Sequence, residues 1–136
     1  MIRGINHVTF AVHDLENSYR FYRDILGCEP VVRWDRGAYL LAGSLWVALA
    51  LDAATRPGPL SEYTHVAFDV SPEDFPALSA RILAAGTRTW KENTSEGPSL
   101  YFEDPNGHKL EIHATDLEAR LRYARSRPWE GTEFHR

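Results

Sequence analysis

One short pattern occurs twice in the chain, and it constrains the fold more than any other feature. Residues 5–12 read INHVTFAV and residues 63–70 read YTHVAFDV, with a histidine at the third position of each. In both segments apolar residues alternate with His, Thr, Ala or Asp, which predicts strands with one apolar face. A helix-like stretch follows each strand. The chain therefore reads as one module used twice, in which His7 and His65 occupy equivalent positions.

Three segments carry apolar residues at helical spacing. Residues 14–26 and 71–86 follow the two repeated strands, and a glycine marks the end of each. Near the end of the chain, Thr115 and Glu118 have the spacing of a capping box, which predicts a third helix over about residues 115–126. Each module is thus expected to run strand, helix and further strands.

Two tight turns set the register of two hairpins. A two-residue turn at 43–44 places Tyr39 and Trp46 on one face, which makes that face a candidate pocket wall. A three-residue turn at 105–107 places Glu111 on a polar face of the second hairpin. Three further polar or aromatic residues share that face: Ser99, Tyr101 and His113.

The length and composition favour one folded domain. The chain has 136 residues, of which 43% are hydrophobic and 25% charged, an ordinary globular composition. A single core typically serves about 100 to 200 residues. We expect one α+β domain over residues 1–136, with modules at about 4–52 and 62–114 and a C-terminal helix at about 115–126.

Charge and hydropathy argue against several classes of partner. The net charge is −4 and the basic residues are dispersed, so no basic stripe for nucleic acid is expected. The longest apolar stretch, residues 45–51, is far shorter than the roughly 20 residues that a membrane span needs. The lone Cys28 cannot form an internal disulfide, and no apolar signal core follows Met1. These features predict a cytoplasmic protein that binds neither nucleic acid nor membrane.

Two histidines at equivalent positions and one strand carboxylate suggest a metal site. A set of two His and one carboxylate binds a divalent ion and leaves coordination positions open for substrate. The candidates are His7, His65 and Glu111. Isolated His and Glu residues are more often surface or hydrogen-bonded groups, so spacing alone supports a metal site weakly. The repeated module brings the two interpretations into balance.

The segment 90–101 (WKENTSEGPSLY) allows two interpretations. Runs of Ser, Asn and Gly usually form a solvated connection. The same oxygens could also surround a cation, with Lys91 beside them to bind an anion.

A family resemblance covers nearly the whole chain. The segments that carry it are residues 7–9 (HVT), 34–46 (WDRGAYLLAGSLW), 63–65 (YTH) and 90–111 (WKENTSEGPSLYFEDPNGHKLE). Together they resemble the FosA-type fosfomycin glutathione transferases of the glyoxalase, or vicinal-oxygen-chelate, superfamily. The resemblance implies two paired βαβββ modules that form a cupped mixed sheet. It also implies a domain-swapped homodimer whose sites are shared between subunits.

The resemblance also implies the ligands of two ions. Manganese is expected between His7 of one subunit and the His65 and Glu111 positions of the other. A potassium loop maps onto Asn93, Ser95, Gly97, Ser99 and Tyr101.

The same resemblance implies that the enzyme adds glutathione to the epoxide of fosfomycin. Lys91 and Arg120 would offset the charge of the phosphonate. Tyr39 is a candidate group to assist the thiol, and the alternative interpretation is a wall aromatic that only packs. Trp34 and Arg36 could line the thiol entrance. The positions implied to contact substrate are Thr9, Trp46, Tyr63, Lys91, Ser95, Ser99, Tyr101 and Arg120, with Thr9, Tyr39, Lys91 and Arg120 as the catalytic set.

Three other functions are compatible with the sequence. A related enzyme could open the epoxide with water, or with cysteine or bacillithiol. Hydrolysis needs a carboxylate base, and the turn at 43–45 supplies none. An extradiol dioxygenase shares the ligand set but uses ferrous iron and a catechol. A drug-binding module of the same fold would need no metal.

Overall fold

A computed structural model describes all 136 residues of the chain. Its first sheet has four strands: β1 (His7–Val12), β2 (Glu29–Trp34), β3 (Gly37–Ala42) and β4 (Leu45–Leu51). They lie in the order β1-β4-β3-β2, with β1 parallel to β4 and the other pairs antiparallel. One edge of this sheet is therefore β1, the strand that begins with His7.

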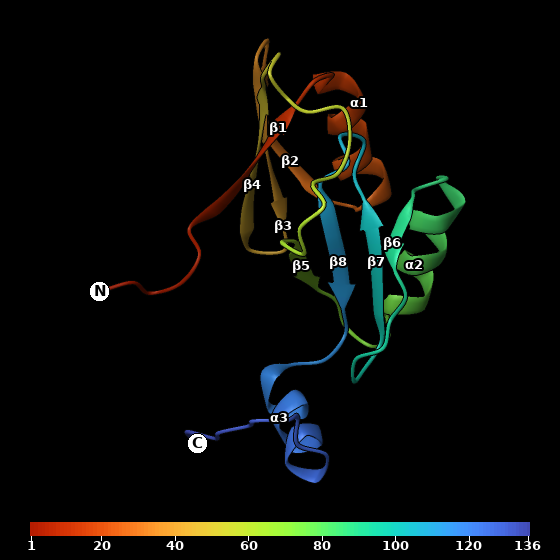
Figure 1. Cartoon of the computed structure of the whole chain (residues 1–136). Coiled ribbons are helices and arrows are strands. Elements are labelled where there is room, and N and C mark those ends of the chain that lie inside the picture. The colour runs from red at the N-terminus through yellow and green to blue at the C-terminus, as the bar shows by residue number, and fades with distance from the viewer.

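The second sheet repeats the arrangement of the first. It consists of β5 (Val66–Asp69), β6 (Thr89–Lys91), β7 (Ser99–Glu103) and β8 (Lys109–His113). The order is β5-β8-β7-β6, again with one parallel pair, β5 with β8. The predicted α+β fold of two βαβββ units is confirmed. Within one chain β1 and β5 do not pair, so each remains an edge strand (Figure 1).

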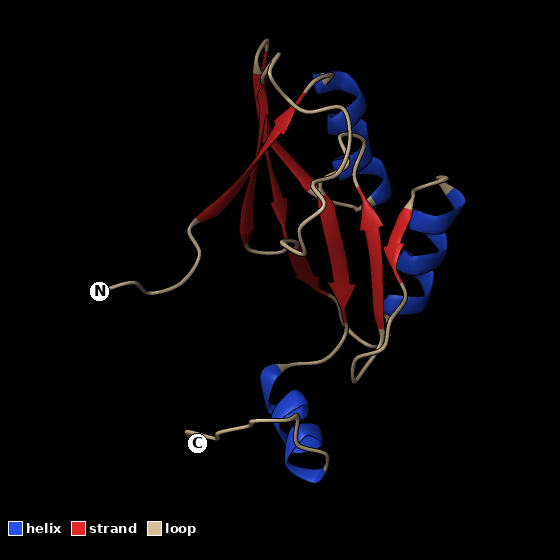
Figure 2. Ribbon diagram, viewed as in Figure 1, coloured by secondary structure: helices blue, strands red, loops and turns tan.

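Two of the helices cover the sheets. In Figure 2, α1 (Leu15–Arg20) and α2 (Phe75–Ala84) lie on the same side of the strands. The helix α1 continues directly into a π-helical turn, η1 (Phe21–Ile25), before Gly27 ends the segment with φ +76°. The third helix, α3 (Leu117–Ser126), lies beyond the end of β8 and apart from the sheets. None of these helices is long and apolar enough to cross a membrane.

Two of the predicted helix starts were wrong by a few residues. The helix α2 begins at Phe75, because the Ser71 hydroxyl accepts a hydrogen bond from the Asp74 backbone N–H at 3.1 Å and forms a turn first. The cap of α3 is Asp116, whose carboxylate accepts from the Ala119 N–H at 2.8 Å. Thr115 lies one residue before this cap, and its hydroxyl contacts Nε2 of His113 at 2.6 Å instead.

Both predicted hairpin registers are confirmed. Ala42 pairs with Leu45 across the first turn, where Gly43 has φ +60°. Tyr101 pairs with Glu111 in the second hairpin. Because the registers hold, the apolar residues face the helices, and the polar faces named above point to the opposite side of each sheet.

The apolar core joins the two modules into one body. Fifteen buried residues form a single cluster that draws on both sheets. Next to it, the Tyr22 hydroxyl donates to the buried Asp104 carboxylate at 2.7 Å, and the Asn106 amide donates to the Ser18 hydroxyl at 2.9 Å. Burial raises the pKa of Asp104 above its usual value. These bonds link the β7–β8 turn to the first module, leaving the polar face of each sheet free to form a site.

Candidate metal and anion site

The centre of the candidate site is a contact between His65 and Glu111. His65 lies just before β5, not inside a strand as the alternation predicted. Its Nε2 lies 3.0 Å from Oε1 of Glu111, and its Nδ1 donates to the carbonyl of Tyr63 at 2.8 Å. A neutral imidazole that donates through Nδ1 has a lone pair on Nε2. In that form Nε2 and Oε1 of Glu111 are two acceptors that face each other, and a cation between them satisfies both. The donor set therefore fits a divalent metal ion.

An aromatic frame holds the His65 ring. Tyr63, Trp90 and Tyr101 surround it, with ring centroids 5.0, 5.2 and 6.0 Å away. The Trp90 indole is fixed in turn by donating to the carbonyl of Leu110 at 3.0 Å. The sequence interpretation assigned no role to Trp90, because strand alternation does not show which ring will lie against His65. Such a frame limits the orientations open to the imidazole.

The second oxygen of Glu111 is also held. The Ser99 hydroxyl donates to Oε2 at 2.7 Å, and Nδ1 of His113 lies 3.3 Å from the same oxygen. The Glu111 side chain is only 8% exposed. A buried carboxylate needs partners of this kind, so Oε1 is left to face His65 and the cation position.

His7 lies apart from this pair in the single chain. It is exposed, its ring lies 4.3 Å from that of Trp46, and its Nδ1 is 2.7 Å from the Asn6 side-chain oxygen. No group of three His, Cys, Asp or Glu side chains within the chain is arranged to hold a metal ion. The three predicted ligands therefore do not meet within one subunit.

An aromatic row lines the open face of the first sheet. Tyr39 packs edge-on against Trp46 at 4.9 Å and against Trp34 at 5.0 Å. Thr9 is exposed on β1 beside this row. Arg36 lies near the far end of β4, where it donates to the carbonyl of Leu51 at 3.3 Å. Arg36 is thus about five residues, or roughly 16 Å, along the sheet from the Trp46 end.

Two cations flank the Glu111 side of the site. The Lys91 ammonium donates to the Tyr63 hydroxyl at 2.5 Å and lies over the rings of Tyr63 and Tyr101. The hydrogen bond to Tyr63 raises the pKa of Lys91 above its ordinary value, and the charges of Tyr101 and Glu111 add to the effect. Lys91 therefore remains charged at neutral pH. Arg120 on α3 lies 3.7 Å from Glu96, an ion-pair distance.

Two donors that lack a hydrogen-bond partner belong to predicted substrate positions, and one of them is the Arg120 Nε that lies 3.7 Å from Glu96. Four buried side-chain polar atoms lack a hydrogen-bond partner, and they include Nε1 of Trp46 and Nε of Arg120. Buried donors are usually satisfied, so an unpaired one indicates a missing partner. Both are N–H groups, and a ligand that accepts hydrogen bonds would satisfy them.

Hydrogen bonds within the predicted cation loop join its own residues. The Asn93 amide donates to the carbonyl of Gly97 at 2.8 Å, and its oxygen accepts from the backbone N–H and the hydroxyl of Ser95. The Ser95 and Tyr101 hydroxyl oxygens are 3.5 Å apart. These contacts bring the oxygen-bearing groups of the loop close to the face that carries Glu111.

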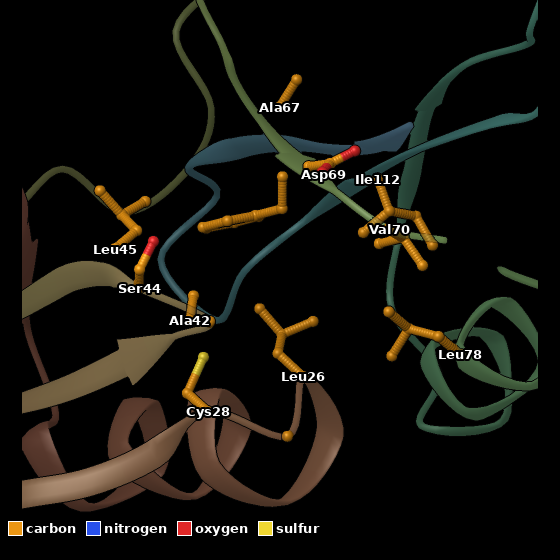
Figure 3. A pocket seen from close by; sticks show the side chains of 13 residues that line it. Leu26, Cys28, Ala42, Ser44, Leu45, Ala67, Asp69, Val70, Leu78 and Ile112 are labelled. Carbon is orange, nitrogen blue, oxygen red and sulfur yellow. The ribbon is translucent and has the colours of Figure 1, made fainter. Parts of the chain in front are cut away.

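Two cavities lie away from these residues. One has a volume of about 450 Å³ and lies between the β3–β4 turn, η1, β5 and α2 (Figure 3). Its lining is mostly apolar and includes Cys28, whose pKa burial raises to about 11, so the thiol stays protonated and unreactive. The other, of about 480 Å³, is lined by α1, η1 and the loops at 57–59 and 103–107. Neither contains a predicted site residue.

Comparison with known proteins assigns the chain to a family. Residues 4–112 match the Glyoxalase/Bleomycin resistance protein/Dioxygenase superfamily. The chain is 48% identical to the glutathione transferase FosA of Serratia marcescens, with 98% of this chain and 96% of that one aligned. It is 39% identical to the metallothiol transferase FosB of Staphylococcus epidermidis, over 90% of this chain and 91% of that one.

A solved structure agrees with these sequence matches. A mutant of the fosfomycin resistance protein FosX from Listeria monocytogenes, complexed with Mn(II) and 1S,2S-dihydroxypropylphosphonic acid, is 32% identical, with a TM-score of 0.77. The match covers 90% of this chain and 99% of that one. The chain belongs to the glyoxalase superfamily and, within it, to the Fos family represented by the glutathione transferase FosA.

Proposed function

We propose that this protein transfers the thiolate of glutathione to an epoxide carbon of fosfomycin and thereby inactivates the antibiotic. One observation carries the proposal: Nε2 of His65 and Oε1 of Glu111 face each other at 3.0 Å, in a chain 48% identical to the glutathione transferase FosA. The pair has the chemistry of a metal site, and the relative supplies the reaction. A cytoplasmic location follows from the reaction, since glutathione is the main cytosolic thiol.

The metal site is proposed to form in a homodimer. His7 is exposed on the edge strand β1, and the His65–Glu111 pair lies beside the edge strand β5. If β1 of one subunit approaches β5 of its partner, His7 completes the ligand set of the other chain. Manganese is the proposed ion, because the FosX relative was solved with Mn(II). Two imidazoles and one carboxylate leave positions open for substrate.

The charges around the site suit a phosphonate epoxide. When bound, the divalent ion supplies Lewis acidity to the oxygen that becomes negative as the ring opens. Lys91 stays protonated and, with Arg120, offsets the charge of the phosphonate, which would otherwise repel an incoming thiolate. The N–H groups of Trp46 and Arg120 that lack a hydrogen-bond partner would donate to ligand oxygens, the one on Arg120 in addition to its ion pair with Glu96. Thr9 and Tyr63 are proposed to complete the substrate contacts.

The loop around Asn93, Ser95, Gly97 and Tyr101 is proposed to bind potassium. Ser99 belongs to this group as well, and its single hydroxyl proton already points to Glu111. A lone pair of the Ser99 oxygen is then what it presents to a ligand, and this suits a cation better than a phosphonate oxygen. The Ser95 hydroxyl donates to the Asn93 oxygen in the same way, so the phosphonate contact proposed for Ser95 requires this hydroxyl to turn toward the ligand.

The aromatic row of the first sheet is the proposed approach for glutathione. Trp34 and Tyr39 are in edge contact, and the Tyr39 hydroxyl is the candidate acceptor or donor for the thiol. The sulfur attacks one epoxide carbon, the carbon–oxygen bond breaks, and the oxygen keeps the electron pair until it is protonated. Arg36 lies farther along the sheet, where a peptide carboxylate of glutathione is the group it could bind.

Phosphorus NMR tests the reaction directly. Purified protein with Mn²⁺, K⁺ and fosfomycin is expected to give a new phosphonate resonance only when glutathione is present. Because the chain is also 39% identical to a metallothiol transferase, cysteine and bacillithiol are run in parallel. Faster product formation with another thiol would change the assigned co-substrate. Product without any thiol would identify a hydrolase, and no product in any mixture would reject the proposal.

Replacing Lys91 tests the phosphonate contact. We expect Lys91→Ala to raise the KM for fosfomycin at least tenfold, since a charge-assisted hydrogen bond contributes about 1.5 to 3 kcal/mol. The KM for glutathione should stay within about twofold, because the lost charge lies on the fosfomycin side. Steady-state kinetics measure both values, with the exposed Arg88→Ala as the control. A change below twofold in the fosfomycin KM would make Lys91 a surface charge.

A further inference from the structure

We infer that His113 is a positioning residue that holds the Glu111 carboxylate through Ser99. The inference rests on the proposed metal site and adds a residue to it that neither contacts substrate nor binds the ion. His113 lies two residues after Glu111 on β8, so both side chains point to the same face. It pairs across the strands with Ser99.

The His113 ring connects two hydroxyl groups. Its Nδ1 contacts the Ser99 hydroxyl, and its Nε2 lies 2.6 Å from the Thr115 hydroxyl. The side chain is only 16% exposed, so solvent is a poor substitute for these partners. Ser99 in turn donates to Glu111 at 2.7 Å. The result is an unbroken chain of hydrogen bonds from Thr115 to the carboxylate.

The bond from Ser99 to Glu111 has a defined direction. The ionised Glu111 carboxylate only accepts, so the Ser99 hydroxyl donates its one proton to it. Ser99 then accepts from Nδ1–H of His113. The other ring nitrogen, Nε2, contacts the Thr115 hydroxyl at 2.6 Å, which fixes the far side of the ring. His113 thus keeps the Ser99 proton directed at Oε2 of Glu111, and Oε1 remains free to face His65.

Thr115 is itself held by the proposed potassium loop. A Cβ atom on Gly97 would lie 2.5 Å from the Thr115 methyl group, so only glycine allows this close approach. Gly97 also has φ +81°, a conformation that side chains disfavour. The Thr115 hydroxyl donates to the carboxylate of Glu96 at 3.3 Å. Packing against the loop therefore fixes Thr115, the outer end of the series of hydrogen bonds that orients Glu111.

Metal binding by two matched variants tests the inference. His113→Leu removes both ring nitrogens at similar volume, whereas the side-chain amide of His113→Asn can replace Nδ1–H as the donor to Ser99. Mn²⁺ titration followed by electron paramagnetic resonance gives the dissociation constant without turnover. We expect weakening of about 10- to 100-fold for His113→Leu, the range found when a partner of a metal ligand is lost. The Asn variant should stay within about threefold of wild type.

Controls separate this role from a general loss of structure. The exposed His135→Leu makes the same substitution away from the site and should bind Mn²⁺ like wild type. Circular dichroism and thermal melting show whether each variant is folded. If folded His113→Leu binds Mn²⁺ within twofold of wild type, or if His113→Asn is as weak as His113→Leu, the inference is wrong. Absence of Mn²⁺ binding by the wild-type protein would instead overturn the proposed function.

Discussion

A mixture of two inactive variants is expected to regain activity. His7→Ala and Glu111→Ala should each lose nearly all transfer activity, because each removes one ligand from every site. In a heterodimer of the two, one site combines the intact His7 of one subunit with the intact Glu111 of the other. Random pairing at equal amounts makes half of the dimers mixed, so co-expressed chains should show about a quarter of wild-type activity. The physical reason is that His7 lies apart from Glu111 in the single chain.

The converse mixture is the control for this experiment. A chain that carries both substitutions is co-expressed with wild-type chains at equal amounts. If sites are shared, the mixed dimers have no intact site and about a quarter of the activity remains; if each chain holds its own site, about half remains. Differently tagged chains allow the mixed dimers to be purified and assayed alone. Failure of the first mixture to regain activity would place all three ligands in one subunit.

The second large effect is expected on metal affinity. Glu111→Ala should abolish tight Mn²⁺ binding, since it removes the charged ligand and the acceptor that Ser99 needs. In the wild-type protein, Mn²⁺ at about 100 times its dissociation constant adds roughly 2.7 kcal/mol of stability, which raises Tm on the order of 5 to 10 °C. Glu111→Ala should show no such rise. Thermal melting with and without Mn²⁺ measures the difference.

A matched control excludes a general effect of removing a carboxylate. Glu118 is exposed on α3 and pairs only with Arg136, so Glu118→Ala should keep the full Mn²⁺-dependent rise in Tm. Unchanged stabilisation of Glu111→Ala by Mn²⁺ would remove Glu111 from the ligand set. Loss of the rise in both variants would point to damage of the fold, which circular dichroism without metal would reveal.

Local pattern was enough to predict much of the fold. The repeat of residues 5–12 at 63–70 predicted two similar modules, and each became one sheet with the same strand order. The Gly43 turn and the turn at 105–107 set two hairpin registers that the structure confirms. Side chains alternate strictly along a strand, so a correct turn places every later residue on the correct face.

Predictions that depended on competing local hydrogen bonds were less accurate. Both Thr115 and Asp116 can cap a helix, and their spacing does not decide between them. The structure assigns Asp116 to the cap because Thr115 bonds to His113, a residue on the preceding strand. Likewise, the Ser71 hydroxyl accepts from the Asp74 N–H and forms a turn, so that α2 begins only at Phe75. Such choices depend on groups that the chain brings together only when it folds.

The sequence by itself determined the repeat, the hairpin registers and the face on which Glu111 lies, because these depend on neighbours along the chain. Only the tertiary structure decided that His65 faces Glu111, that Trp90 frames it, and that His7 lies elsewhere. The physical reason is that these relations depend on how the strands pair and twist, with partners 46 residues apart for His65 and Glu111. No local periodicity encodes a distance between side chains that meet only after the sheets have formed.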